Sequence, residues 1–188
     1  AGSLLVLHLA VAPILLVAMA ANPLVPEDFM KAVRFETLPS EVADRDLVLV
    51  NSPFPFVTSY YMLRAELDGL PLPQHLRSLA TGLDNMTIIR EDEKTIVIVP
   101  DYGFNITPLD QLVRSKQHPL KIGDQVKLSG MTAEVLAVSE RANKVRFRFD
   151  VPLEDPSLYW LRWREGKFEP FVPPAIGKTT VLRAPPVR

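Results

Sequence analysis

The sequence predicts an α+β protein that is mainly β, with an apolar N-terminal helix before the strands. Residues 1–26 contain no Asp, Glu, Lys or Arg, whereas the remainder mixes charged and apolar residues as soluble domains do. From residue 44 onward, short runs rich in β-branched and aromatic residues are separated by turn residues, a pattern typical of strands. Proline is frequent, with 18 residues against 8 glycines, and it shortens helices and strands because it lacks the backbone N–H.

Composition excludes several classes of function. The chain has 188 residues and a formal net charge of −1, so no overall basic field attracts nucleic acid. Hydrophobic residues make up 47% of the chain, which is enough for a core and too many for an acidic disordered chain. Cysteine is absent, which excludes disulfides, thiolate nucleophiles and cysteine metal sites. We therefore expect no nucleic-acid partner.

The opening segment, residues 1–22, is expected to be a transmembrane or apolar helix. The apolar run from Leu4 to Ala21 is interrupted only by His8 and Pro13, and about 20 helical residues span the hydrocarbon core of a bilayer. His8 is the one ionisable side chain in this run, and we interpret it as a neutral, hydrogen-bonded imidazole.

Two other interpretations of this segment stay open. Ala18-Met19-Ala20 has the A-x-A pattern of a signal-peptide cleavage site, and a buried helix of a larger core is the third possibility. Residues 23–43 are expected to form a proline-containing linker. We expect a membrane-anchored chain with an extracytoplasmic soluble domain, although the charges that flank the apolar run do not fix its side.

Residues 44–119 are expected to form a small α+β module. Residues 47–50 read as a strand buried on both faces, and Thr58 or Ser59 caps a helix that extends to about Asp68. This helix carries the apolar side chains Tyr60, Leu63, Ala65 and Leu67, and Gly69 is placed to end it. Strand, turn and helix make half of a βαβ unit, and residues 75–80 read as either helix or strand. The runs Met86–Arg90 and Thr95–Pro100 then predict a hairpin with a charged tip.

Residues 120–172 are expected to form a barrel-like β-module, followed by a proline-rich tail at residues 173–188. Gly130 is expected to bend a strand, and Val145, Phe147 and Phe149 alternate with basic residues, as in a sheet buried on one face. Residues 158–164 and 167–171 predict a further hairpin, and residues 179–182 an edge strand in the tail.

Two resemblances follow from these residues. GDQVKLSGMTAEVLAV, within residues 122–150, resembles the opening hairpin of SH3-like β-barrels. The order LVLVNSPFPF, TIVIVP, VRFRFDVPLEDPSLYWLRW and FVPPAIG after an apolar helix resembles the C-terminal region of large multi-spanning bacterial membrane proteins without assigned function. The second resemblance implies an origin at the end of a polytopic protein, and it brings no catalytic residues.

The reactive residue types do not converge in the sequence. His8, His75 and His118 lack metal-ligand spacing, and the glycines do not form a phosphate loop, so we expect neither a metal nor a cofactor. Ser52 follows a buried strand, where a hydrolase nucleophile would sit, but Pro53 removes the N–H that an oxyanion hole would use. Asn51 is expected to bond to backbone in the turn.

A stretch of basic and aromatic residues is the best binding candidate. Such residues bind lipid headgroups, partner proteins or stacked bases, although alternate aromatics also fill cores. The candidate partner-binding residues are Arg146, Arg148, Tyr159, Trp160, Arg162, Trp163 and Arg164.

We therefore expect a non-catalytic interaction or scaffold domain of a membrane protein or membrane complex. Its expected partners are membrane lipid and other membrane-protein subunits, and no small-molecule substrate is evident. One alternative is a membrane-associated hydrolase or transferase with a site at residues 51–56, near Asp101 and Tyr102. The other alternative is a lipid- or ligand-binding β-domain, which requires a hollow interior.

Overall fold

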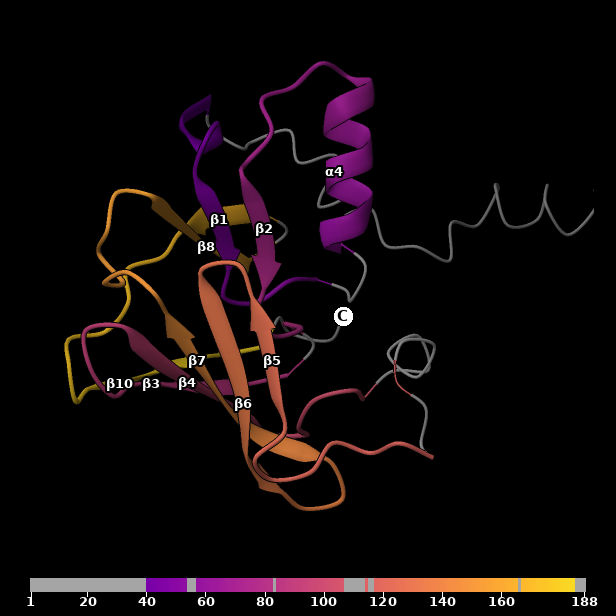
Figure 1. Ribbon diagram of the computed structural model, residues 1–188, viewed down its shortest axis with the longest axis vertical. Helices are drawn as coiled ribbons and strands as arrows, with labels where there is room; N and C mark the ends of the chain where they lie inside the picture. The colour runs from indigo at the N-terminus through magenta and orange to yellow at the C-terminus, as the bar shows by residue number, and fades with distance from the viewer. Residues whose placement is uncertain are drawn as a thin grey trace, which may run out of the picture.

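The computed structural model describes residues 40–53, 57–82, 84–106, 114, 117–165 and 167–184. Two β-sheets pack face to face, and one α-helix covers the outer side of the smaller sheet (Figure 1). Strand order is β2-β1-β8-β9 in the four-stranded sheet and β10-β3-β4-β7-β6-β5 in the six-stranded sheet. The elements, after a 3₁₀ turn at Ser40–Val42, are β1 (Asp46–Leu49), α4 (Val57–Leu67), β2 (His75–Ser78), β3 (Met86–Arg90), β4 (Thr95–Pro100), β5 (Gln125–Leu128), β6 (Met131–Val138), β7 (Ala142–Phe149), β8 (Leu158–Arg164), β9 (Lys167–Pro170) and β10 (Thr179–Leu182).

A βαβ unit opens the described part of the chain. β1 leads into α4, and the chain returns as β2, which pairs parallel to β1. The helix ends in a Schellman motif: Leu70 N donates to Ala65 O at 2.8 Å, and Gly69 N donates to Glu66 O at 3.3 Å. Gly69 has a φ of 65°, a left-handed conformation that glycine adopts without strain. The predicted helix and its glycine end are confirmed. Residues 75–78, for which the sequence allowed either helix or strand, form β2, the second strand of the βαβ unit.

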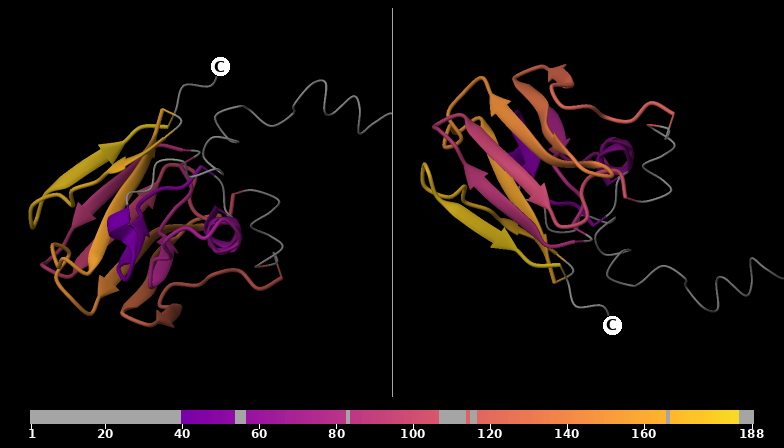
Figure 2. Two further views of the ribbon diagram at one scale, coloured as in Figure 1. Left: turned by 90° about the horizontal axis from the view of Figure 1, so that it is seen from above. Right: turned by 90° about the horizontal axis from the view of Figure 1, so that it is seen from below.

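The side chains of β1 and of Val50, which follows it, divide between two apolar clusters. Val48 and Val50 point into the core between the two sheets, whereas Leu47 and Leu49 point toward α4. All four side chains are fully buried, so the prediction that this strand is covered on both faces is confirmed. Figure 2 shows α4 end-on beside β1 and β2, on the side away from the larger sheet.

The predicted fold class is wrong in its division into two modules. β4, from the first expected module, pairs with β7 from the second. β8, which was expected inside a barrel, pairs parallel to β1. Both expected modules thus contribute strands to both sheets, and the described residues form a mainly β sandwich with one short helix rather than an α+β module followed by a small barrel.

The predicted transmembrane helix is not part of the structure as described. Residues 1–22 and most of the linker at residues 23–43 lie outside the described residues. Within the described ranges, no helix has both the length and the apolar character needed to cross a bilayer. The fold class is therefore corrected to a β-sandwich whose described helix, α4, has 11 residues and covers a sheet.

Several local predictions are confirmed. β3 and β4 form the predicted hairpin, and β8 and β9 form another. β10 is the predicted edge strand and pairs with β3. The prediction that Gly130 bends a strand was wrong. Gly130 has a φ of 73° and lies in the tight turn that joins β5 to β6.

Candidate interaction surfaces

The turn after β1 is a buried polar cluster. The amide side chain of Asn51 bonds twice to the backbone of Trp163: Trp163 N donates to Oδ1 at 2.7 Å, and Nδ2 donates to Trp163 O at 3.1 Å. Ser78 Oγ donates to Ser52 Oγ at 2.9 Å. Asn51 thus bonds to backbone as predicted, although its partner lies in β8 rather than in the turn.

This geometry does not favour the hydrolase alternative. Ser52 has no exposed surface, so a substrate reaches its hydroxyl only if the sandwich opens. Asp101 and Tyr102 are exposed; Asp101 accepts a bond from Asn85 Nδ2 at 3.1 Å, and the Tyr102 N–H donates to Asp84. Residues 54–56, the rest of the candidate site, lie outside the described residues.

The aromatic members of the predicted partner-binding set belong to different apolar clusters. Trp160 is buried between the sheets, where its Nε1 donates to Leu153 O at 2.8 Å. Trp163 is buried on the α4 side and packs edge-on against Phe168 at a ring-centroid distance of 4.9 Å. Tyr159 is half-buried against the same cluster. Both tryptophans are therefore core residues.

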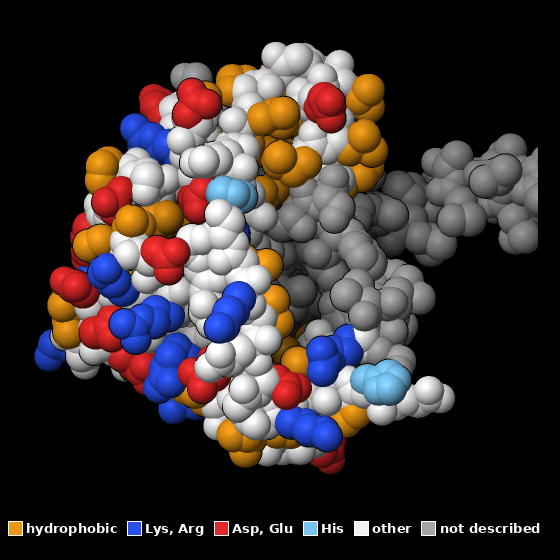
Figure 3. All heavy atoms as spheres, viewed as in Figure 1, with side chains coloured by type: hydrophobic (Ala, Val, Ile, Leu, Met, Phe, Trp, Pro, Cys, Tyr) orange, Lys and Arg blue, Asp and Glu red, His pale blue; other side chains and the backbone are white. Residues whose placement is uncertain are grey.

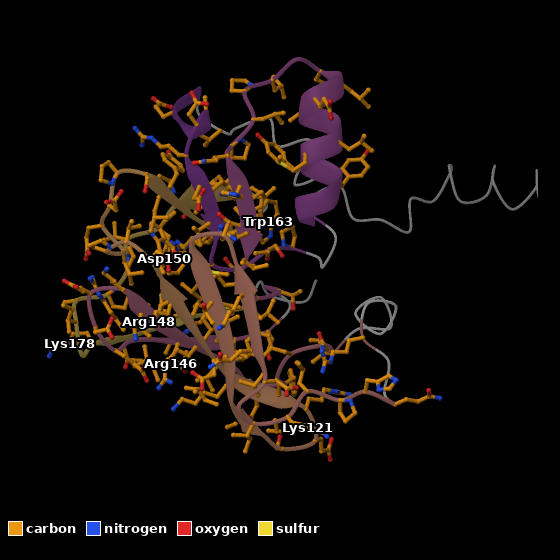
Figure 4. All side chains as sticks on the ribbon, viewed as in Figure 1. Lys121, Arg146, Arg148, Asp150, Trp163 and Lys178 are labelled. Atoms are coloured by element: carbon orange, nitrogen blue, oxygen red, sulfur yellow. The ribbon has the colours of Figure 1, made fainter. Side chains whose placement is uncertain are left out.

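The basic members of the set lie on two different sheets. Arg146 pairs with Glu91 at 2.8 Å and with Glu134 at 3.1 Å, while Arg148 is exposed on the same strand, β7. Figure 4 shows these two arginines together and Trp163 apart from them, in the other sheet. Arg162 pairs with Glu169 and Arg164 with Glu165. The structure does not bring the seven residues into one surface, and their role in partner binding stays a prediction.

The described histidines do not form a metal site. His75 Nδ1 lies 2.7 Å from Asp46 Oδ1, and His118 is exposed. His8 lies outside the described residues. Among the residues that the structure describes, no group of three or more His, Asp or Glu side chains could hold a metal ion.

Sequence reasoning missed Arg77, which ties the two sheets together. This β2 side chain is 7% exposed; its Nη2 bonds to Asp46 Oδ2 at 3.3 Å and also donates to Ser129 O in the β5–β6 turn. Its Nε is buried without a hydrogen-bond partner. No local pattern identifies this contact, because Ser129 lies 52 residues further along the chain.

A second arginine, Arg90 at the end of β3, was also missed. It is buried, donates to the carbonyl oxygens of Asp92, Glu93 and Pro174, and forms two bonds to the carboxylate of Glu154. The hydrogen bond to Glu154 raises the pKa of Arg90 above its ordinary value and lowers the pKa of Glu154. Arg90 therefore fastens the tail before β10 to the β3–β4 hairpin.

Two adjoining cavities open on the side of the sandwich where β2 faces the β5–β6 hairpin. One has a volume of about 320 Å³ and lies between β2 and the end of the hairpin, with Arg77, Leu128 and Met131 in its wall. The other has a volume of about 440 Å³, and its wall includes Val126, Ala133 and Phe147. Phe104 and Asn105 border both. The ligand-binding alternative, which requires a hollow interior, stays a prediction.

The outward face of α4 carries an apolar stripe, which we define as Tyr60, Leu63 and Leu67. These side chains are 46%, 59% and 78% exposed and lie at i, i+3 and i+7, so they share one face of the helix. Tyr61 and Ala65, on the opposite face, are buried against the sheet. Leu70 and Leu72 are also exposed just after the helix. Figure 3 shows the apolar side chains gathered over α4.

Comparison with known proteins identifies no relative: no family model, no curated protein and no solved structure matches this chain.

Proposed function

We propose that this chain is a non-catalytic interaction domain of a membrane protein or membrane complex, and that its α4 stripe contacts membrane lipid. The observation that carries the proposal is the exposure of Tyr60, Leu63 and Leu67 on one face of a helix whose residues Tyr61 and Ala65 are buried against the sheet. Burial of a leucine side chain is worth about 1.5–3 kcal/mol, and the folded domain leaves this stabilisation unused on α4.

The position of the first described residues, beside α4, supports lipid as the partner. Val42, in the 3₁₀ turn that begins the described residues, is buried in the same cluster as Tyr61 and Ala65 of α4. The uncharged run from Leu4 to Ala21 therefore precedes a segment that reaches the domain beside α4. An apolar stripe that includes a tyrosine also fits the boundary between headgroups and acyl chains.

The resemblance to the C-terminal region of multi-spanning bacterial membrane proteins supports the same proposal. It implies an origin at the end of a polytopic protein, which is consistent with a domain close to the membrane. Under this proposal the sandwich is a rigid support that holds α4 at the membrane.

Site-specific fluorescence tests the lipid contact, because the chain contains no cysteine and accepts a single labelled one. An environment-sensitive dye attached to Leu67→Cys is expected to shift to shorter wavelength when phosphatidylcholine vesicles are added. The matched control is Val172→Cys, which is 82% exposed and lies outside α4. It is expected to show no shift.

Two outcomes contradict the proposal. The first is equal behaviour of the two labels, since the dye on α4 then reports no lipid contact of its own. The second is a shift at residue 67 that needs no vesicles and grows with protein concentration. That result would assign the α4 stripe to contact with a second copy of the chain.

A further inference from the structure

One edge strand of each sheet, β2 and β5, borders the smaller cavity, and β5 also borders the larger one. Among the strands that the structure describes, β2 lies at one edge of the four-stranded sheet and β5 at one edge of the six-stranded sheet. All four residues of β5 are exposed, including Val126 at 51% and Leu128 at 48%. An exposed edge strand offers unpaired N–H and C=O groups to another strand, and proteins usually cover or charge such edges.

The register of the β5–β6 hairpin shows which backbone groups are free. Val135 N donates to Asp124 O at 3.0 Å, and the pairs continue to Leu128 opposite Met131. Hydrogen-bonded and non-hydrogen-bonded pairs alternate along an antiparallel ladder. Asp124, Val126 and Leu128 therefore direct their backbone groups toward β6, whereas Gln125 and Lys127 direct theirs to the free edge.

The edge is held in place by the rest of the fold. Arg77 of β2 donates to Ser129 O in the turn that follows β5, and its charge is balanced by Asp46. This contact fixes the hairpin relative to β2. A partner strand thus meets a preorganised edge, which lowers the entropy lost on binding.

The side chains of β5 give this edge a specific chemistry. Val126 borders the larger cavity and Leu128 the smaller one, and these two residues lie about 7 Å apart along the strand. Lys127 points to the opposite face and forms no ion pair with any described residue. It lies in register with Thr132 and then with Arg148, both on the outer face of the sheet.

We propose that the free edge of β5 binds an extended peptide segment of a partner protein by strand addition. The peptide places apolar side chains at alternate positions against the two cavities, and it places acidic side chains on the outer face beside Lys127. Main-chain hydrogen bonds to Gln125 and Lys127 supply affinity, and the cavities and Lys127 supply specificity. This inference concerns a different surface from α4 and does not depend on lipid contact.

The probe is a capped seven-residue peptide of alternating glutamate and valine. Added to the full chain, it is expected to protect the backbone amides of Gln125 and Lys127 from hydrogen exchange, because these amides gain partners. A peptide of the same length with proline at alternate positions, which cannot donate to the edge, is expected to give no protection.

Three variants define the site. Lys127→Pro removes an N–H that faces the edge and leaves the bonds to β6 intact, so it is expected to weaken binding about tenfold, as the loss of one or two backbone hydrogen bonds does. Lys127→Glu is expected to weaken binding through charge repulsion. Val181→Pro is the matched control, at the edge strand β10. Arg90 N donates to Lys178 O, so Lys178 and every second residue after it direct their backbone groups toward β3. The backbone N–H of Val181 therefore faces the free edge of β10, as that of Lys127 faces the free edge of β5. The Val181→Pro variant is expected to bind as the unaltered chain does.

Three results would overturn the inference. One is the absence of protection at β5 in the folded chain. Another is an equal loss of binding in Lys127→Pro and Val181→Pro, which would indicate a general effect on the sheet. The last is protection of the β5 amides that appears without peptide as the protein concentration rises, which would assign this edge to pairing between two copies of the chain.

Discussion

The side chain of Asn51 pairs with the backbone of Trp163 as a further residue of a strand would. Val50 N donates to Leu161 O at 2.9 Å, and one residue later the Asn51 amide both accepts from Trp163 N and donates to Trp163 O. The β1–β8 ladder is thereby extended by a side chain. Because Asn51 is only 4% exposed, water does not replace these bonds if they are lost.

Asn51→Ala is expected to lower the free energy of unfolding by about 2–4 kcal/mol, because it leaves the N–H and the C=O of Trp163 buried without partners. Urea denaturation followed by tryptophan fluorescence measures this loss. Gln74→Ala, at an exposed side chain, is the control and is expected to change stability by less than about 0.5 kcal/mol. Equal effects of the two substitutions would show that the Asn51–Trp163 pair contributes little.

We expect position 82 to require glycine, because the side chain of Asn51 lies against it. A Cβ at position 82 would lie 2.8 Å from Asn51 Nδ2, and the φ of Gly82 is not in the left-handed region. Gly82→Ala therefore displaces the Asn51 side chain rather than straining the backbone. A double-mutant cycle of unfolding free energies tests this: the cost of Gly82→Ala is expected to fall sharply in the Asn51→Ala background. Strict additivity would contradict the steric explanation.

Arg77→Met is expected to destabilise the sandwich by about 3 kcal/mol, because it leaves the carboxylate of Asp46 without its arginine and the carbonyl of Ser129 without a donor. The loss is expected to be smaller in the double variant Arg77→Met/Asp46→Asn, which also removes the carboxylate charge that Arg77 balances. Hydrogen exchange is the second measurement, and the β5–β6 hairpin is expected to open more readily in the single variant. Unchanged exchange in the hairpin would show that Arg77 does not hold it.

Asp84 is expected to make stability depend on pH. Burial raises the pKa of its carboxyl group, the backbone N–H of Tyr102 lowers it, and the charge of Asp101 raises it, with a net increase. Since the folded-state pKa lies above the unfolded one, the stabilising contribution is complete below the unfolded pKa of about 4 and is lost as the pH rises through the folded pKa.

Asp84→Asn removes this buried charge and keeps an oxygen that accepts from the Tyr102 N–H. The variant is expected to be more stable than the unaltered chain at neutral pH, and the difference is expected to disappear as the pH falls toward about 4. Unfolding free energies measured between these two limits check the sign. A variant that is less stable at neutral pH would contradict a raised pKa for Asp84.

The sequence alone predicted those features of the fold that depend on neighbouring residues. Val145, Phe147 and Phe149 of β7 are buried on one face, as their alternation predicts, because successive side chains of a strand point to opposite faces. The same rule located the β3–β4 and β8–β9 hairpins, whose strands are joined by short turns. The glycine end of α4 was also readable, since a left-handed residue at that position favours glycine.

The candidate surfaces were only partly readable. The sequence named Tyr60, Leu63, Ala65 and Leu67 as the apolar residues of α4, but apolar residues on both faces of a helix do not show which face the sheet covers. The free edge of β5 was not predicted, because the hairpin-like stretch at residues 123–138 does not show which strands lie beside it in the sheet. A strand is an edge only by virtue of which strands lie beside it, and that is a long-range property.

By itself, then, the sequence determined most of the strands, the buried face of β7 and the apolar character of the opening segment, because periodicity and composition act over a few residues. Tertiary structure alone decided that β8 pairs with β1 instead of completing a barrel with β7. The reason is physical: β8 is apolar on both faces, with Trp160 toward one cluster and Leu161 and Trp163 toward the other. Such a strand needs a layer on each side, and only the central position between the six-stranded sheet and α4 provides both.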